Sequence, residues 1–233
     1  STFLQRAYDQ IINDLCINNS NALILVYRAS IYGNKDMTHL GFNDITMLSN
    51  MPNLMYLAPT TVEELESSIR YGVEHHNHPI AIRIPVGSPI YETSQSNTTG
   101  CPVTSCNITQ SGNTIAIIGV GNFYHKAVEL SHAIHDAIHI SPTLVKPLCI
   151  SSLDTDTLNE LTKNHNIVIT LEDGELEGGY GQKIASYYGK TSMNVLNYGI
   201  SKQFYDRYNP EDVLQQNHLD FEHILDDIQN IQH

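Results

Sequence analysis

The chain has 233 residues, 41% of them hydrophobic, and its 25 acidic and 12 basic residues give a formal net charge of −13. This charge repels nucleic acid and anionic membranes, and no apolar run approaches the roughly 18 residues that a membrane-spanning helix needs. We therefore expect a globular protein that binds neither nucleic acid nor a membrane and that is long enough to bury two modest cores.

Helical and strand-like patterns alternate in the first ninety residues. Apolar residues recur at three- and four-residue intervals from Phe3 to Cys16, which predicts an amphipathic helix. Thr61 and Glu64 have the spacing of a capping box, and the helix that they begin is expected to reach about Glu74. Short apolar runs predict three strands, at 22–27, 55–58 and 80–84.

Residues 88–113 are rich in Ser, Thr, Asn and Gly, and we interpret them as a connection that adds a strand or two on its way to a second unit. The predicted strands of that unit are 114–118, 143–145, 167–171 and 194–198, and its predicted helices are 123–137, 154–163, 181–188 and the acidic tail from 210. Alternating strands and helices predict the α/β fold class, with two domains of parallel or mixed sheet. We place these domains at 1–95 and 114–233, with 96–113 as a linker.

The four cysteines show no CxxC spacing. Cys101 and Cys106 are close enough in sequence to form a disulfide or half of a metal site, but free thiols are the favoured interpretation for these two and for Cys16 and Cys149. The chain opens at Ser1, inside a helical pattern and without a Met. We expect a cytoplasmic protein, or one from a plastid-type organelle if a targeting segment has been removed.

Two glycine-containing strings have both an ordinary and a functional explanation. Gly119-Val120-Gly121 lies between a strand and a helix, as in a dinucleotide fingerprint, but Tyr124 stands at the third glycine position, so a simple turn is favoured. Glu172-Asp173-Gly174, followed by the glycines of 178–181, suits a tight turn into a helix whose amino end could hold an anion. A turn that only packs the sheet is again favoured.

Histidines gather at two places, at 75–78 before a strand and at His132, His135 and His139 on one helical face. Imidazoles at such spacing can bind zinc, but a zinc site also needs further ligands at defined spacing. A solvated histidine face is the favoured interpretation, and we predict no metal site in this chain.

Arg6 on the opening helix, Arg28 at the end of the first strand and His39 in the following loop are the candidate catalytic residues. Two guanidinium groups can bind a carboxylate or a phosphate, and an imidazole can move a proton to or from a carbonyl oxygen. From spacing alone, three unrelated surface groups would be the favoured interpretation.

The order of the pieces resembles a known family. The opening ten residues, Arg28-Ala29, Thr38-His39-x-Gly41 and Arg83-x-Pro85-x-Gly87 are similar to the 1-deoxy-D-xylulose-5-phosphate synthases, which are thiamine-diphosphate enzymes of the transketolase superfamily. The similarity continues through Phe42-x-Asp44-Ile45, Met51-Pro52-Asn53, Ala58-Pro59, Gly119-x-Gly121, Val145-Lys146-Pro147-Leu148, Lys163-Asn164-His165 and Gly178-Gly179-x-Gly181. The resemblance identifies an incomplete pyrimidine-binding domain followed by the carboxy-terminal domain.

The resemblance implies a transferase that decarboxylates pyruvate and joins the two-carbon unit to glyceraldehyde 3-phosphate, giving a precursor for isoprenoid (terpenoid) and thiamine biosynthesis. By the resemblance, Phe3 lies against the cofactor pyrimidine, while Arg6, Arg28 and His39 contact the substrates and His39 carries the proton. The groups that hold magnesium and the diphosphate belong to an amino-terminal domain outside this chain. We expect this chain alone to be inactive, and the complete enzyme to be a homodimer.

Three departures from the family pattern bear on the acceptor substrate. In the family's Asp-Arg-Ala-Gly, Tyr27 replaces the aspartate and Ser30 replaces the glycine. Lys35 stands where an aspartate is expected, next to Asp36. Val86 replaces an arginine that helps to hold substrate phosphate. Loss of that contact would remove roughly 1.5–3 kcal/mol of charge-assisted binding. Two alternatives therefore stay open: a non-catalytic or acceptor-altered paralogue that serves as a binding or regulatory module, and one subunit of a split thiamine enzyme.

Overall fold

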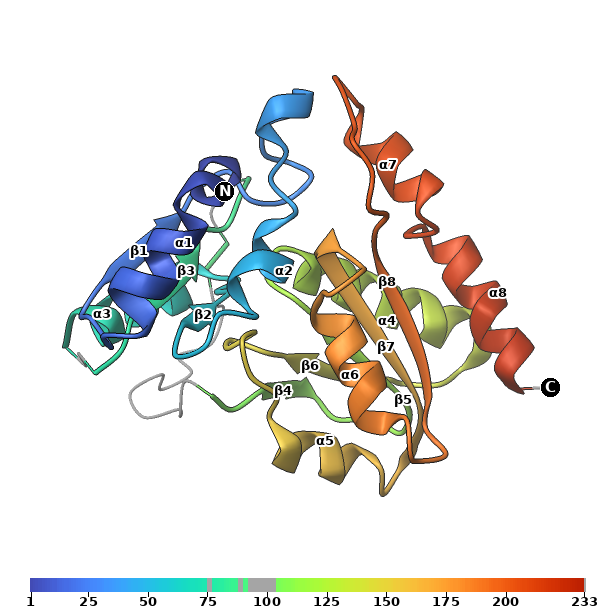
Figure 1. The fold of residues 1–233 in the computed structure, drawn as a ribbon. Helices are drawn as coiled ribbons and strands as arrows, with labels where there is room; N and C mark the ends of the chain where they lie inside the picture. Colours follow the sequence, from blue (N-terminus) through green and yellow to red (C-terminus); the bar gives the residue numbers. More distant parts are fainter. Residues whose placement is uncertain (75–76, 88–89, 92–103, 233) are drawn as a thin grey trace.

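The computed structural model of the protein describes residues 1–74, 77–87, 90–91 and 104–232, which form two α/β halves packed against each other (Figure 1). His75, His76, Cys101 and most of the predicted linker lie outside the described residues. The halves differ in size, since one has a three-stranded sheet and the other a five-stranded sheet.

The first half is built around the parallel sheet β1-β3-β2. Its elements are the 3-10 helix η1 (Thr2–Ala7), α1 (Tyr8–Gln10), the π-helical turn η2 (Ile11–Cys16), β1 (Leu23–Val26), the 3-10 turn η3 (Met37–His39), α2 (Asp44–Leu48), β2 (Met55–Leu57), α3 (Val62–Glu74) and β3 (Ile80–Arg83). The opening helical segment packs on one face of the sheet, and α3 packs on the other. The three strands and both helices predicted for this half are confirmed.

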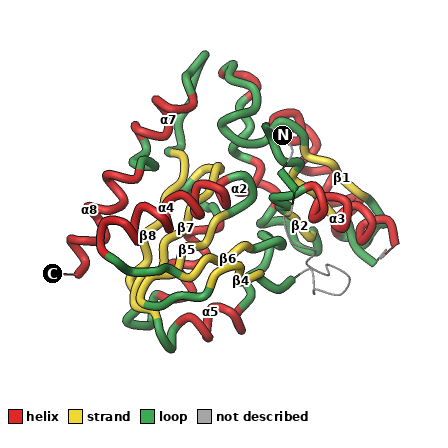
Figure 2. Tube along the Cα trace, turned by 180° about the vertical axis from the view of Figure 1, so that it is seen from behind, coloured by secondary structure: helices red, strands yellow, loops and turns green. Residues whose placement is uncertain are grey.

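The second half has the strand order β4-β6-β5-β7-β8, in which only β4 is antiparallel to its neighbour. Its elements are β4 (Asn107–Gln110), β5 (Thr114–Gly119), α4 (Phe123–Ile138), β6 (Thr143–Lys146), α5 (Thr155–Leu161), β7 (His165–Glu175), α6 (Tyr180–Tyr188), β8 (Asn194–Ile200), α7 (Pro210–Gln216) and α8 (Phe221–Gln232). Seen from behind, α4 lies in front of this sheet and α8 lies at its side (Figure 2), where α8 packs against α4, while α5 and α6 pack on the other face. β4 is the strand that the connecting segment was expected to add.

One hydrophobic core runs from one half into the other. Ile45 and Leu48 of α2 belong to the same buried cluster as Tyr56 of β2 and as Val168 of β7. Main-chain hydrogen bonds reinforce this contact, because the Ala58 N–H donates to Leu148 O at 2.8 Å and the Ile150 N–H donates to Tyr56 O at 2.8 Å. The segment after β6 therefore continues the pairing at the end of β2.

Two local differences from the predicted pattern are informative. β7 continues four residues past the predicted end, through Glu172 and Asp173, because both carboxylates are buried with partners. In the predicted capping box, Thr61 Oγ1 accepts from the Glu64 N–H at 3.2 Å, but the Glu64 carboxylate accepts from the Thr60 N–H and pairs with Lys146 Nζ at 2.6 Å. The side chain thus connects the two halves and does not bond Thr61.

Cys16, Cys106 and Cys149 carry free thiols, as expected for these three. In the described part of the chain no helix combines the length and the apolar character that crossing a bilayer requires.

Candidate active site

The loop between β1 and α2 is closed at its base by the main chain. The Ser30 N–H donates to Gly41 O at 2.7 Å, and the Gly33 N–H donates to Ser30 O at 3.1 Å. A Cβ on Gly41 would lie 2.1 Å from Arg28 O, so only glycine allows the two ends of the loop to approach this closely. The loop therefore has a defined shape. The 3-10 turn η3, which carries His39, lies just before Gly41.

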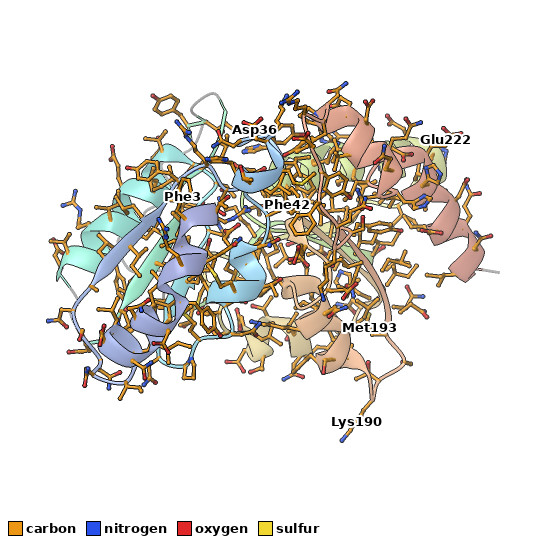
Figure 3. The ribbon with its side chains drawn as sticks, turned by 45° about the horizontal axis from the view of Figure 1, so that its top comes forward. Phe3, Asp36, Phe42, Lys190, Met193 and Glu222 are labelled. Atoms are coloured by element: carbon orange, nitrogen blue, oxygen red, sulfur yellow. The ribbon has the colours of Figure 1, made fainter. Side chains whose placement is uncertain are left out.

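Phe3 and His39, which the resemblance assigns to the cofactor and to the substrates, are in direct contact. Their ring centroids are 5.1 Å apart and their planes cross at 87°, an edge-to-face arrangement. The Thr38 hydroxyl lies 2.7 Å from His39 Nδ1, which leaves Nε2 as the ring nitrogen available to a ligand. Thr2 Oγ1 donates to Leu40 O and so ties the opening helix to the same loop. Phe3 is 65% exposed and His39 is half-buried, so this pair faces outward (Figure 3).

Both candidate arginines have exposed side chains. Arg6 follows Phe3 by three residues in a 3-10 helix, which has three residues per turn, so the two side chains share one face. The Arg28 guanidinium is exposed and donates to Asn34 Oδ1 at 3.4 Å. Both cations are therefore open to solvent, and Arg6 lies on the face of the opening helix that carries Phe3.

A buried ionic network that the sequence reading missed lies behind this loop. Arg83, at the end of β3, donates from Nε to Asp44 Oδ2 at 2.8 Å and pairs through Nη1 with Asp173 of β7. The Tyr56 hydroxyl also donates to Asp44, and Asn122 Nδ2 donates to Asp173 Oδ2 at 3.0 Å. At most 2% of each of the three charged side chains is exposed. Asp44 begins α2 directly after the loop, so the network joins the candidate site to the second half.

The same network accounts for the glycine pair at 119–121. In an open sheet of this order, ligands bind at the carboxyl ends of the strands where the chain reverses direction, here between β5 and β7. Arg83 of the first half occupies this place, because a Cβ on Gly121 would lie 3.6 Å from Arg83 Nη1 and Asp173 pairs with the same guanidinium. The favoured interpretation, a simple turn, is consistent with this packing.

The second glycine string does hold an anion at a helix start, but the anion belongs to the chain. The Tyr180 and Gly181 N–H groups, in the first turn of α6, donate to the two Glu172 carboxylate oxygens at 2.9 and 2.8 Å. A Cβ on Gly179 would lie 2.5 Å from the same carboxylate. Burial raises the pKa of Glu172 to about 7, although these N–H donors favour its charged form.

The histidine face of α4 forms no metal site in the described residues, where no group of three or more His, Cys, Asp or Glu side chains is arranged to hold an ion. His132 and His135 line an open polar cavity with Asp136 and Ser141.

The departures from the family pattern have different surroundings. Ser30 has φ of +82°, in the left-handed region that favours glycine. Lys35 is exposed, and its carbonyl accepts from the Arg207 N–H at 2.8 Å, which fastens the loop to the second half. Val86 is half-buried, and its N–H donates to Asn122 Oδ1 at 3.0 Å.

The surface around Phe3 is open and aromatic. Tyr27, Tyr32 and Met37 of the loop region are 58%, 40% and 48% exposed. Phe3, Arg6, Arg28 and His39 do not line the cavity beside Cys149, the one beside α6 or the one beside the histidine face of α4. This part of the molecule therefore presents exposed aromatic and apolar side chains to solvent.

Comparisons with known proteins agree with this arrangement. Residues 1–88 match the family described as "Transketolase, pyrimidine binding domain", and residues 104–224 match "Transketolase, C-terminal domain". The chain is similar to proteins named 1-deoxy-D-xylulose-5-phosphate synthase, with 31% identity over 99% of this chain for Clostridium tetani and 34% over 96% for Clostridium acetobutylicum. It spans 37% and 36% of these relatives, just over a third of their length.

A solved structure has the same fold. It is described as "Split gene transketolase, inactive beta4 tetramer", and it superposes with a TM-score of 0.83 at 20% identity over 98% of this chain and 73% of that chain.

Proposed function

The chain belongs to the transketolase family, and we propose that it is the pyrimidine-binding and carboxy-terminal part of a thiamine-diphosphate-dependent 1-deoxy-D-xylulose-5-phosphate synthase. The complete enzyme would decarboxylate pyruvate and join the two-carbon unit to glyceraldehyde 3-phosphate. The observation that carries this proposal is the contact of Phe3 with His39 on an exposed face that also bears Arg6. The product would serve isoprenoid and thiamine biosynthesis.

The residues present fit one part of the cofactor. Phe3 offers an exposed aromatic ring for the aminopyrimidine, whereas the described residues offer no cluster of metal ligands for magnesium. Thiamine diphosphate, when bound, supplies the nucleophilic carbon and the electron sink for loss of carbon dioxide. We therefore assign the groups that hold magnesium and diphosphate to an amino-terminal domain, on the same polypeptide or on a partner.

His39 and the two arginines would act on the substrates. The hydrogen bond between the Thr38 hydroxyl and Nδ1 orients the imidazole, so that Nε2 can give a proton to, or take it from, the oxygen of the acceptor carbonyl. Arg6 and Arg28 would bind the pyruvate carboxylate or the acceptor phosphate through charge-assisted hydrogen bonds.

An altered acceptor is the second candidate, and Val86 favours it. A half-buried apolar side chain stands where the similar synthases have an arginine, so one charged contact to a substrate phosphate is missing at this position. We expect this enzyme to use a phosphorylated aldehyde less well than the similar synthases do, because one charge-assisted contact is missing.

The test is to assemble the chain with the proposed amino-terminal domain and to measure thiamine-dependent release of carbon dioxide from pyruvate, with and without glyceraldehyde 3-phosphate. Release that rises with this aldehyde supports the synthase. Release with weak use of the aldehyde supports an altered acceptor. Failure of the assembled protein to bind thiamine diphosphate would leave a non-catalytic paralogue.

Replacement of His39 tests its role in the assembled enzyme. His39→Ala should lower turnover by about 100-fold or more, because general acid–base catalysis typically contributes at least that much. His132→Ala, an exposed histidine on α4, is the matched control and should leave turnover unchanged. Circular dichroism should show both variants folded. A normal rate for His39→Ala would remove this residue from the mechanism.

We also propose that the complete enzyme is a homodimer and that it lies in the cytoplasm. The similar solved structure is described as an inactive tetramer of a split-gene transketolase, which supports the idea that this part of the fold needs a further segment for activity. That segment can be the preceding domain of one polypeptide or a separate subunit, and the open reading frame that encodes Ser1 distinguishes the two.

A further inference from the structure

A cavity of about 660 Å³ lies between the two halves, beside the start of α6. Ser49 and Asn50, which follow α2, line it from the first half, and Gln182 and Lys183 of α6 line it from the second. Because the His39 loop precedes α2 and Ser49 follows it, this cavity lies at the other end of α2 from the candidate active site. It is therefore a separate place on the molecule.

The lining of this cavity has an unusual charge for this protein. The chain carries 25 acidic and 12 basic residues, yet the cavity is lined by one lysine and no Asp or Glu. Its remaining polar groups are hydroxyls and amides, among them Ser151, Ser152 and Gln182. A positive charge surrounded by neutral hydrogen-bonding groups favours an anion.

Lys183 provides that charge and has a free donor. Its Nζ donates to Ser49 O and to Ser49 Oγ, both at 2.9 Å. An ammonium group has three N–H donors, so one is left without a protein acceptor within the described part of the chain, where no carboxylate forms an ion pair with it. Burial lowers the pKa of Lys183 more than the nearby Glu172 raises it, and an anion in the cavity would compensate for this loss of solvation.

The start of α6 adds little to this site. Its Tyr180 and Gly181 N–H groups already bind the Glu172 carboxylate, and the Gly178 N–H donates to Gln182 Oε1 at 2.7 Å. Recognition must therefore come from the lysine and the side chains around it.

We propose that this cavity binds a small oxyanion, a phosphate or a carboxylate, through Lys183 Nζ and the surrounding hydroxyl and amide groups. Since both halves line the cavity, the bound anion stabilises their packing against each other.

Calorimetric titration of the chain with sodium phosphate and with sodium acetate, at an ionic strength held constant with sodium chloride, tests the proposal. Lys183→Met should weaken binding by about tenfold or more, since a hydrogen bond to a charged group contributes at least that much. Lys163→Met, which removes an exposed lysine of a surface pair, should change nothing. A preference for phosphate identifies a phosphorylated ligand, and equal binding identifies a general oxyanion site.

Ser152→Glu provides a test that leaves the Lys183–Ser49 contact in place. The new carboxylate should occupy the cavity and abolish binding of both anions, while the melting temperature without anions stays within a few degrees of the parent. No binding of either anion by the parent chain, or equal binding by the parent and by Lys183→Met, would overturn the proposal.

Discussion

The backbone conformation of Ser30 is determined by the closure of the loop on Gly41. Its φ of +82° lies in a region where a side chain is strained, and its N–H closes the loop on Gly41. The related synthases usually have glycine at this position. The sequence alone reveals the replacement, but the structure supplies the physical reason why glycine suits the position.

We expect Ser30→Gly to stabilise the fold by about 1 kcal/mol. A non-glycine residue in this region carries backbone strain on the order of 1–3 kcal/mol, which the glycine removes. Glycine also raises the conformational entropy of the unfolded chain, and this costs about 0.4–1 kcal/mol of stability. Urea denaturation measures the change. Ala29→Gly, at a neighbour without a positive φ, should instead destabilise the fold, and a loss of stability in both variants would contradict the strain argument.

Glu172 should give the stability of the protein a pH dependence opposite in sign to that of an ordinary paired carboxylate. Burial raises its pKa from 4.5 to about 7, so between these values the folded state keeps a proton that the unfolded state has lost. The contribution of Glu172 to the free energy of unfolding is therefore largest below pH 4.5. It falls as the pH rises to about 7 and stays low above that pH. The amplitude is on the order of 3 kcal/mol.

Glu172→Gln tests this assignment, because an amide does not titrate in this range. The free energy of unfolding of the parent minus that of the variant should fall between pH 4.5 and pH 7 and should not change above it. Glu160→Gln, an exposed carboxylate in a surface pair, is the control and should show no such trend. A parallel pH profile for the parent and Glu172→Gln would assign the slope to another group.

At the scale of elements, most helices and strands follow from apolar periodicity. The opening helix, α3, α4 and the parallel strands of both sheets have enough apolar residues at regular spacing to be predicted without tertiary contacts, whereas β4 has a single apolar residue and no such pattern. The five-residue α2 was missed because its role comes from packing between the halves. β7 was predicted too short because charged residues normally end a strand, and the partners of Glu172 and Asp173 lie far away in sequence.

The candidate site was predictable only in part, because its residues also lie far apart in sequence. Phe3 and His39 were brought together by the resemblance, since nothing in their spacing implies contact. Asp44, Arg83 and Asp173 lie up to 129 residues apart in sequence, so no local pattern identifies them as one network.

Arg83→Met should destabilise the protein by about 3–5 kcal/mol, because it leaves two carboxylates buried without their cation. Arg70→Met, an exposed arginine on α3, should cost little and serves as the control. Addition of Asp44→Asn and Asp173→Asn to Arg83→Met should recover part of the loss, since it removes the unpaired charges. Chemical denaturation measures all three proteins, and equal stability of Arg83→Met and Arg70→Met would show that the network contributes nothing.

At the scale of the whole molecule, the surface that carries Phe3 and the His39 loop is the candidate face for the missing domain. The exposed side chains of the opening helix and of the His39 loop include Phe3, Arg6 and Tyr32, and the buried network joins α2, which follows this loop, to the second half. In Figure 3, Phe3 and Asp36 lie in the upper part of the view, and Met193 and Lys190 lie in the lower part.

We expect the 233-residue chain alone to show no measurable affinity for thiamine diphosphate with magnesium in calorimetry. The aromatic ring of Phe3 contributes only one contact to the pyrimidine, and the described residues hold no metal-binding cluster. Phe3→Ala should therefore make no difference in the isolated chain, although it should weaken binding once the amino-terminal domain is present. Micromolar affinity of the isolated chain would contradict this prediction.

The main-chain pairing of Tyr56 and Ala58 with the residues after β6 has a consequence for how the molecule comes apart. Two domains that meet only through side chains can melt one after the other, but these two share backbone hydrogen bonds as well as a core. A differential scanning trace should accordingly contain one endotherm, and the amide protons of Ala58 and Ile150 should exchange with deuterium no faster than the slowest protons of either sheet.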